Sequence, residues 1–217
     1  MEKMTDFFAR RVKGYDEHMI NGVAGCKEAY KKMAELIPEG AEALLDLGCG
    51  TGLELENIFK LYPDIAVTGI DITAQMLDKL REKYKGKKIT LINGDYFKTD
   101  IGRCRFDAAI SFQTLHHFSH TMKTELYKKI CTSLKNGGSY IECDYMVETQ
   151  DEEDHWFSEN ARIRRELDIS EDVFYHYDTP CTVENQISML LQAGFADVRK
   201  VFRIENTTII TARKEII

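Results

Sequence analysis

The stretch from residue 43 to residue 52, Ala-Leu-Leu-Asp-Leu-Gly-Cys-Gly-Thr-Gly, constrains the fold more than any other. A short apolar run ends in an acid, and Gly48, Gly50 and Gly52 then alternate with other residues before an amphipathic segment begins. Glycines at alternate positions allow positive φ and close approach of a ligand to the backbone, and the next helix offers unpaired N–H groups. The stretch therefore predicts a strand, a tight turn and a helix that bind a nucleoside-bearing ligand.

Strand and helix patterns alternate along most of the chain. Apolar runs typical of strands lie at 42–47, 65–71, 89–92, 106–112 and 139–145. Helical spacing of apolar residues separates them at 53–62, at 73–86 with Thr73 as the expected N-cap, and at 121–134. Such alternation implies parallel strands joined by right-handed crossovers, with ligands at the carboxyl ends of the strands. We expect an α/β fold with a doubly wound, mostly parallel sheet.

The N-terminal part and one later insertion depart from this alternation. Residues 1–38 predict a helical cap, and the apolar positions over 17–37 form one stripe, read as a single helix weakened by Gly22 and Gly25. Residues 148–181 are acidic and aromatic and carry no strand pattern, so we interpret them as a helical, aromatic lid over the site. Cap and lid are expected to belong to one domain that spans the whole chain.

The C-terminal residues predict a helix followed by a hairpin. The helix is expected to begin at Thr182 as its N-cap and to end before Gly194 at the C′ position. Two strand-like runs, 198–204 and 207–212, then follow with a separation too short for a crossover. We therefore expect an antiparallel hairpin at the edge of the sheet.

Composition limits the partners of the chain. The formal net charge of −7 and the isoelectric point near 5.5 argue against a nucleic-acid substrate, because phosphate binding usually needs a basic face. No apolar run reaches the length of a membrane span, and the N-terminus lacks the apolar core of a signal peptide. The six cysteines are scattered without a C-x-x-C pair, as expected for reduced thiols. We expect a cytoplasmic protein; its oligomeric state stays open, with a homodimer among the options.

Five short motifs occur in a fixed order along the chain. They are 44–52 in the glycine-rich stretch, Gly-Ile-Asp at 69–71, Gly-Asp-Tyr at 94–96, 106–111, and 134–138. In this order they resemble the class I, Rossmann-like S-adenosylmethionine-dependent methyltransferases, especially the small-molecule branch. A dinucleotide fingerprint would carry its third glycine one residue later, where Leu53 stands. The resemblance implies a seven-stranded sheet, S-adenosyl-L-methionine as cofactor, and methyl transfer to a small molecule.

The resemblance also implies a set of cofactor contacts. Asp46 would face the methionine ammonium, and the amides from Gly48 to Gly52 would line the methionine and the ribose. Asp71 would accept hydrogen bonds from the ribose hydroxyls, and Ile72 would lie against the adenine. The remaining implied contacts are Cys49, Gly50, Asp95 (with the adenine amino group), Tyr96 and Ser111.

The catalytic residues depend on the acceptor. A hydroxyl or an acidic carbon needs a general base, whereas a neutral amine or a thiolate needs only alignment with the methyl group. His117, after the fourth strand, is the candidate base; the alternative is that this histidine turn only packs. A metal pair with His120 is the less favoured interpretation, and we expect no metal. Tyr15 is the second candidate at the reacting centre, because a tyrosine here folds over the cofactor in similar enzymes; a core aromatic is its alternative.

Substrate contacts are expected mainly from the lid. Its aromatic residues and arginines suit a planar or carboxylate-bearing small molecule. Arg162 has glutamates at helical spacing on both sides, so Arg165 is the preferred arginine. The predicted substrate-binding residues are Phe112, Trp156, Arg165, Tyr175 and His176.

Two other functions stay open. Residues 182–214 are loosely similar to the tail of carboxy-S-adenosylmethionine synthases, which modify the cofactor itself. A non-catalytic protein that binds S-adenosylmethionine or NAD is the third option, although the glycine spacing weighs against NAD.

Overall fold

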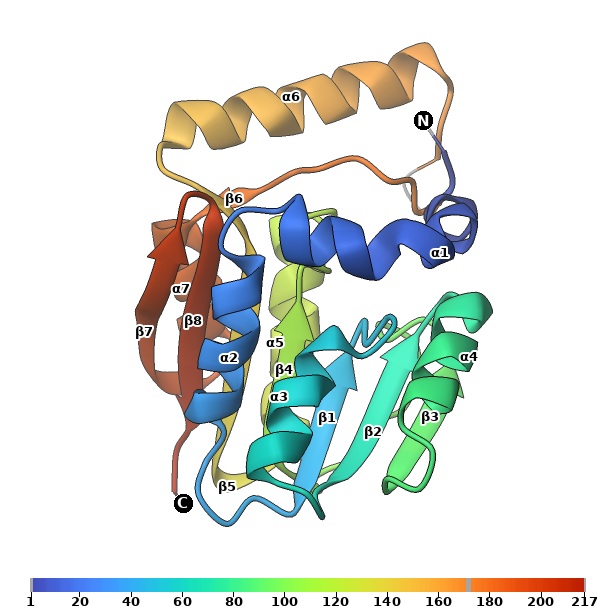
Figure 1. Ribbon diagram of the computed structural model, residues 1–217. Coiled ribbons are helices and arrows are strands. Elements are labelled where there is room, and N and C mark those ends of the chain that lie inside the picture. Colours follow the sequence, from blue (N-terminus) through green and yellow to red (C-terminus); the bar gives the residue numbers. More distant parts are fainter. Residues whose placement is uncertain (1, 171–172, 217) are drawn as a thin grey trace.

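The computed structural model describes residues 2–170 and 173–216, and its centre is an α/β sheet (Figure 1). Seven strands follow the order β3-β2-β1-β4-β5-β8-β7. Their bounds are β1 Ala43–Leu47, β2 Ala66–Asp71, β3 Ile89–Asn93, β4 Phe106–Phe112, β5 Leu134–Val147, β7 Phe195–Ile204 and β8 Thr207–Lys214. Strands β1 to β5 pair in parallel, and β8 runs antiparallel to both β5 and β7. The predicted doubly wound sheet and its C-terminal hairpin are confirmed.

A two-residue strand was not predicted. Strand β6 (Cys181–Thr182) pairs in parallel with the end of β5, where Met146 lies opposite Cys181. This pairing attaches the chain after the lid to the carboxyl end of the sheet, so the residues just before β6 lie over the strand ends.

Seven helices pack around the sheet in the described residues. They are α1 Met4–Asn21, α2 Cys26–Leu36, α3 Leu53–Leu61, α4 Ala74–Lys83, α5 His120–Ser133, α6 Gln150–Glu166 and α7 Val183–Gln192. Helices α2 and α3 cover one face and α5 and α7 the other, while α1 and α6 lie beyond the carboxyl ends of the parallel strands (Figure 1). Within residues 2–170 and 173–216, none of the helices is both long and apolar enough to traverse a bilayer.

The prediction of one helix over 17–37 is wrong, because the chain breaks between α1 and α2. Gly25 adopts a left-handed conformation with φ of 78° at the N-cap of α2, which an α-helix cannot contain. A Cβ at Gly25 would also lie 2.7 Å from Cβ of Ile204. The two glycines of the stripe thus mark a corner that turns α1 across the ends of the strands.

The helix ends predicted from the sequence are confirmed in part. Thr182 caps α7 by accepting a hydrogen bond from the Asn185 N–H, as predicted, and Gly194 follows the helix with φ of 94°. Thr73 stands at the N-cap of α4, but its side chain makes no cap hydrogen bond. Its N–H instead donates to Oδ1 of Asp71 at 2.7 Å, which forms a turn between the end of β2 and the helix.

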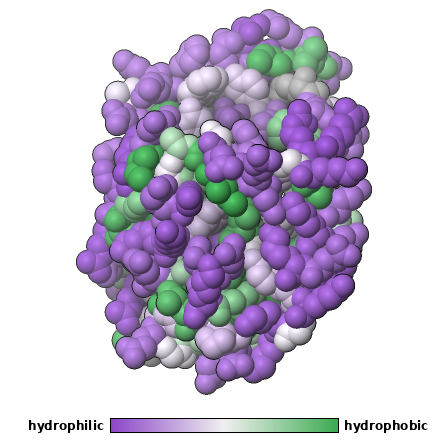
Figure 2. Space-filling model, in the orientation of Figure 1, coloured by the Kyte–Doolittle hydropathy of each residue, from purple (hydrophilic) through white to green (hydrophobic). Residues whose placement is uncertain are grey.

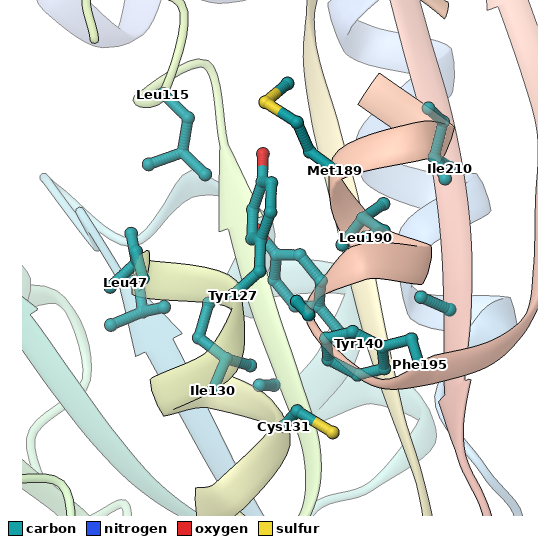
Figure 3. Packing of buried hydrophobic residues seen from close by; sticks show 14 of the residues in the cluster. Leu47, Leu115, Tyr127, Ile130, Cys131, Tyr140, Met189, Leu190, Phe195 and Ile210 are labelled. Atoms are coloured by element: carbon teal, nitrogen blue, oxygen red, sulfur yellow. The ribbon is translucent and has the colours of Figure 1, made fainter. Parts of the chain in front are cut away.

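The sheet is buried on both faces, as a parallel sheet between two helical layers requires. On the side of α5 and α7, Tyr127 and Tyr140 are fully buried beside Leu190 (Figure 3). A second apolar layer lies under α2 and α3 and includes Leu44 and Ile58. Each such side chain stabilises the fold by about 1.5–3 kcal/mol. On the surface shown in Figure 2, apolar side chains are scattered among polar ones.

Candidate functional site

Two adjoining cavities lie at the carboxyl ends of the parallel strands. The larger cavity, about 770 Å³, lies between α1, the loop after β4, the end of β5, residues 176–178 and the β7–β8 turn. The smaller cavity lies between the start of α1, the glycine turn and the ends of β2 and β3. Phe8, Tyr15 and Gln113 line both cavities. Ligands in the two cavities would therefore meet at these three residues.

The glycine turn forms one wall of the smaller cavity. Gly48 has φ of 68°, and its N–H donates to the carbonyl of Ile70 at 2.8 Å. A Cβ at Gly48 would lie 2.3 Å from Oγ1 of Thr114, so no side chain fits there. Gly52, with φ of 72°, begins α3. The turn thereby brings bare backbone against the ends of β1 and β4.

Asp71 is held rigidly at the rim of the smaller cavity. Its Oδ2 accepts a hydrogen bond from the Gly50 N–H at 2.9 Å, and its Oδ1 accepts from the Thr73 N–H. Burial raises the pKa of Asp71 although both amides favour the charged form. A carboxylate fixed at the end of the second strand is suited to accept hydrogen bonds from a ribose.

Asp46 and Glu54 form a buried carboxyl pair behind the glycine turn. They are 1% and 5% exposed, and burial together with the mutual negative charge raises the pKa of Asp46. Burial, with Asp71 nearby, raises the pKa of Glu54 to about 7. Oδ2 of Asp46 and Oε1 of Glu54 accept no hydrogen bond from residues 2–170 and 173–216. Buried oxygens of this kind need a cation or a proton.

Most other predicted cofactor residues lie around the smaller cavity. Ile72, Asp95 and Tyr96 line it, as does Phe112, which was predicted as a substrate residue. Asp95 accepts a hydrogen bond through Oδ1 from the Phe97 N–H at 2.8 Å. The remaining Asp95 oxygen lies 3.6 Å from Nζ of Lys98. The Phe112 ring also stacks on Tyr30, with 4.0 Å between ring centroids.

Two predicted cofactor residues point elsewhere. Ser111 lies on the opposite side of β4, where its hydroxyl is hydrogen-bonded to the Tyr140 hydroxyl at 2.7 Å. Cys49 is buried, with its sulfur packed against Gly69. Cys49 reaches the smaller cavity only through its place in the turn.

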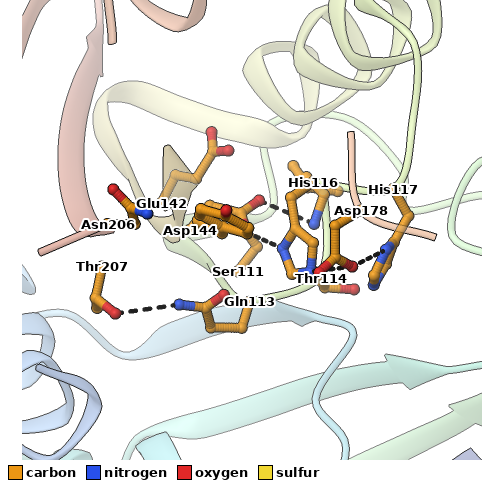
Figure 4. A network of polar contacts seen from close by, with 12 residues as sticks. Ser111, Gln113, Thr114, His116, His117, Glu142, Asp144, Asp178, Asn206 and Thr207 are labelled. Carbon is orange, nitrogen blue, oxygen red and sulfur yellow. Dashed lines mark hydrogen bonds and ion pairs between the residues drawn. The ribbon is translucent and has the colours of Figure 1, made fainter. Parts of the chain in front are cut away.

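A histidine–carboxylate cluster lies at the wall of the larger cavity (Figure 4). Nδ1 of His116 lies 2.5 Å from Oδ1 of Asp144, and Oδ2 of Asp144 accepts a hydrogen bond from the Leu115 N–H. Burial lowers the pKa of His116, but the Asp144 carboxylate outweighs it and holds this pKa above its ordinary value. Conversely, His116 keeps the pKa of Asp144 low despite complete burial.

The second half of the cluster contains His117 and Asp178. Nδ1 of His117 lies 3.3 Å from Oδ1 of Asp178, and Nε2 of His116 lies 3.6 Å from the same oxygen. Burial and the neighbouring His116 lower the pKa of His117 to about 4. His176 also lines the larger cavity and stacks on Phe7 at 3.5 Å between ring centroids.

Some of the predicted substrate residues line one of the two cavities, and the others line neither. Of the five predicted substrate residues, His176 lines the larger cavity and Phe112 the smaller one. Tyr175 pairs with Lys3 in an isolated bridge, and Trp156 and Arg165 lie on α6 and line neither cavity. Residues 171–172 of the insertion lie outside the described residues.

Several site residues were not predicted from the sequence. Asp144, near the end of β5, follows the same pattern as Asp71 at the end of β2, so a strand-ending acid was the available signal. His116 could not be distinguished from His117 by sequence. Arg10 and Arg11 lie on the α1 side of the larger cavity and form ion pairs with Glu2.

Comparison with known proteins agrees with this geometry. Residues 44–138 match the family model of the methyltransferase domain. The chain is 23% identical to the carboxy-S-adenosyl-L-methionine synthase of Nautilia profundicola, over 99% of this chain and 96% of that protein. It therefore resembles that relative along nearly its whole length.

Two solved structures share the fold. An O-methyltransferase family protein from Burkholderia thailandensis superposes with a TM-score of 0.75 at 15% identity, over 98% of this chain and 63% of that one. Human N-acetylserotonin methyltransferase in complex with S-adenosylmethionine superposes with a TM-score of 0.62 at 19% identity, over 85% and 51%. The chain thus spans less than two thirds of the length of either structure.

Residues 44–138 carry a methyltransferase domain, and together with the fold they support a class I, Rossmann-like S-adenosylmethionine-dependent methyltransferase. The cofactor of this methyltransferase is S-adenosylmethionine, and the residues present fit it. Asp71 presents a carboxylate where the ribose is expected. Asp46 and Glu54 line neither cavity, but each leaves a buried oxygen suited to the methionine ammonium. The backbone at Gly48 is too crowded for a side chain but open to the smaller cavity.

Side chains from the cap and the lid narrow the smaller cavity of the methyltransferase. Its open volume is about 50 Å³, below the roughly 300 Å³ at which ligand pockets begin. Met4 and Phe8 from α1 and Phe174 from the segment before β6 line it. These side chains come from the N-terminal cap and from the lid, so both segments border the place expected for the cofactor.

The Asp46–Glu54 pair should link cofactor binding to pH. An ammonium favours ionised carboxylates, so a Glu54 with a pKa of about 7 has to lose its proton when the cofactor binds. Between pH 8 and pH 6 we expect the affinity for S-adenosylhomocysteine to fall about tenfold. Calorimetric titration in buffers of different ionisation enthalpy should show proton release near pH 6.5.

Glu54→Gln should remove most of this pH dependence. Glu56→Gln is the matched control on the same helix, because Glu56 is exposed and its ion pair among the described residues is with Lys60. Without cofactor, the raised pKa stabilises the fold at low pH, and this contribution is lost as pH rises towards 7. A wild-type affinity that is flat over this pH range would contradict the assignment.

Proposed function

We propose that this methyltransferase transfers the methyl group of S-adenosylmethionine to an oxygen of a small molecule held in the larger cavity. The observation that carries the proposal is the junction of the two cavities at Phe8, Tyr15 and Gln113, beside the histidine–carboxylate cluster. A volume of about 770 Å³ is typical of sites for small organic ligands. The acidic net charge of −7 does not favour a nucleic-acid acceptor.

Methyl transfer from the cofactor to the acceptor is proposed to proceed by in-line displacement. The acceptor oxygen forms a bond to the methyl carbon while the sulfur–carbon bond breaks and its electron pair returns to sulfur. The proton of the acceptor passes to the cluster at the cavity wall. S-adenosylmethionine supplies the activated methyl group, so the chain has to align the acceptor, exclude water and favour its ionised form. Tyr15, at the junction, is proposed to separate the acceptor from bulk water.

His116 is the stronger candidate than His117 for favouring the ionised acceptor. The low pKa of His117, about 4, makes it a poor proton acceptor at neutral pH. His116 is oriented by Asp144 and has a raised pKa. We therefore propose His116, and not the predicted His117, as the main catalytic residue. His117 is its neighbour in the cluster.

His116→Ala should lower turnover about 100-fold or more and leave the affinity for S-adenosylhomocysteine within threefold of wild type. Turnover is measured as the conversion of labelled S-adenosylmethionine in the presence of a pool of hydroxylated small molecules. His155→Ala is the control, because His155 is an exposed histidine on α6. Full turnover in His116→Ala would exclude the cluster from the reaction. If no pool supports transfer although the cofactor binds, a binding protein becomes the better interpretation.

Modification of the cofactor itself is the second candidate function. The full-length likeness to a carboxy-S-adenosyl-L-methionine synthase favours it. Arg10 and Arg11 at the larger cavity favour it too, because two guanidinium groups suit a small molecule that bears a carboxylate and donates a carboxyl group. Mass spectrometry of the ligand that co-purifies with the protein separates the two functions. A carboxylated cofactor would support the second candidate, and unmodified S-adenosylmethionine or its demethylated product would support methyl transfer.

The cap and the lid are proposed to act as the cover of one catalytic domain. Residues 1–38 supply α1, and residues 148–181 supply α6 and the segment that contains His176 and Asp178. The free thiols of all six cysteines are consistent with work in the cytoplasm, which we propose as the location.

A further inference from the structure

Three donor atoms converge at the wall of the larger cavity. One donor atom from each of His116, His117 and Asp178 lies within 4.8 Å of the other two. Figure 4 shows the Asp178 carboxylate between the two imidazole rings. No residue among 2–170 and 173–216 donates a hydrogen bond to Oδ1 of Asp178, although this oxygen is buried. A buried carboxylate oxygen without a donor lacks the compensation that burial requires.

The distances within this group match metal coordination better than hydrogen bonding. The two nitrogens lie 3.3 Å and 3.6 Å from Oδ1 of Asp178, whereas a charge-assisted N–H···O bond is about 2.7–2.9 Å long. In a tetrahedral site with bonds of about 2.0–2.1 Å, neighbouring donor atoms are about 3.3–3.4 Å apart. Nδ1 of His117 also lies 3.2 Å from the carbonyl oxygen of Tyr177, a hydrogen bond that the imidazole gives up when Nδ1 binds a metal ion.

The surroundings supply the orientation that a metal-binding histidine needs. The Asp144 carboxylate accepts a hydrogen bond from the Nδ1–H group of His116. The lone pair of Nε2 is then directed towards Asp178. A carboxylate behind a ligating histidine is the usual arrangement in metal sites. The carboxylates of Asp144 and Asp178 together balance the charge of a divalent ion.

We propose that His116, His117 and Asp178 bind a divalent transition-metal ion, with Zn²⁺ as the reference ion, in the wall of the larger cavity. Two histidines and one carboxylate leave a coordination position open, as in catalytic rather than structural zinc sites. All three residues line the larger cavity, so the open position faces the acceptor. The role of the ion rests on the proposed function. When Nε2 of His116 holds the ion, His116 no longer takes the acceptor's proton; the ion binds the acceptor oxygen as a Lewis acid and lowers its pKa, so that the proton leaves to solvent.

A second cluster in the described residues is less suited to a cation. His120, Glu153 and Cys181 also bring three donor atoms within 4.8 Å. However, the ammonium of Lys123 lies 3.3 Å from the sulfur of Cys181 and repels a metal ion. The Glu153 carboxylate is already engaged by the Thr182 N–H and by the side chain of Asn185.

The test is equilibrium dialysis of the chelator-treated full-length protein against Zn²⁺ alone, with metal content measured by mass spectrometry. Wild type should bind one ion per chain with micromolar or tighter affinity. His117→Ala and Asp178→Ala should each weaken Zn²⁺ binding about 100-fold or more, because each removes one of three ligands. His155→Ala should bind as wild type does. Thermal unfolding without metal confirms that each variant is folded, and Co²⁺ absorption reports the tetrahedral geometry.

Each outcome decides the proposal. Absence of a stoichiometric ion in folded wild type would overturn it, as would equal binding by wild type, His117→Ala and Asp178→Ala. Loss of the ion in His120→Ala, with retention in His117→Ala, would assign it to the second cluster and also overturn the proposal. S-adenosylhomocysteine binding is measured separately on metal-free protein. Cofactor binding without metal binding would overturn the metal site alone, and metal binding without cofactor binding would overturn the proposed function alone.

Discussion

Asp71→Ala should raise the dissociation constant for S-adenosylhomocysteine by about 100-fold or more. The carboxylate is fixed by the N–H groups of Gly50 and Thr73, and it lines the smaller cavity where the ribose is expected. Each hydrogen bond to a charged group is worth about 1.5–3 kcal/mol, so the loss of two ribose hydroxyl contacts costs at least about 3 kcal/mol. Isothermal titration calorimetry measures this loss directly.

Two controls separate this effect from a fold defect. Asp71→Asn keeps one acceptor oxygen and should lose less affinity than Asp71→Ala. Asp78→Ala removes an exposed acid from α4 whose ion pair, in the part of the chain that the structure describes, is with Arg81. The affinity of this variant for S-adenosylhomocysteine should be unchanged. If folded Asp71→Ala bound S-adenosylhomocysteine within tenfold of wild type, Asp71 would not be the ribose ligand.

Gly48→Ala should lower the free energy of unfolding by about 2–5 kcal/mol and abolish cofactor binding. A left-handed conformation costs an alanine about 1–2 kcal/mol, and overpacking adds about 1–3 kcal/mol. The overpacking arises because the new Cβ would lie 2.3 Å from Oγ1 and 2.8 Å from Cβ of Thr114. Relief of this contact would shift the glycine turn into the smaller cavity. Urea unfolding and calorimetric titration measure the two effects.

Gly40→Ala is the matched control for Gly48→Ala. Gly40 has φ of 76°, but a Cβ there would meet no atom within 4 Å. Its loss of stability should therefore be limited to the conformational term of about 1–2 kcal/mol, with cofactor binding intact. An equal loss in both variants would show that backbone conformation, and not the approach of Thr114, makes glycine necessary at Gly48.

The cofactor half of the site was largely predictable from sequence. Gly48, Asp71 and Asp95 occur in local motifs, where a strand end and the next helix lie within a few residues of each other. Their relative positions therefore follow from the strand–turn–helix unit itself. Ser111 was misplaced because strand residues alternate between two faces, and the sequence does not say which face meets the cofactor.

The acceptor half was less predictable, because its residues come from distant parts of the chain. His116, Asp144 and Asp178 belong to the loop after β4, the end of β5 and the segment before β6. The loop starts at Gln113, a residue with φ of 50°, and this turn directs His116 rather than His117 towards Asp144. The spacing of apolar residues in the sequence does not predict the direction in which this turn points its side chains.

The amino-acid sequence by itself determined the alternating sheet, the C-terminal hairpin and the methyl donor, because periodicity and glycine turns are local properties. The tertiary structure decided the rest. The break at Gly25 turns α1 over the strand ends, and α1 then supplies a wall of the larger cavity in the place expected for Trp156 and Arg165 on α6. Helix packing and loop rotation depend on contacts between distant residues, so they decide where the acceptor can lie.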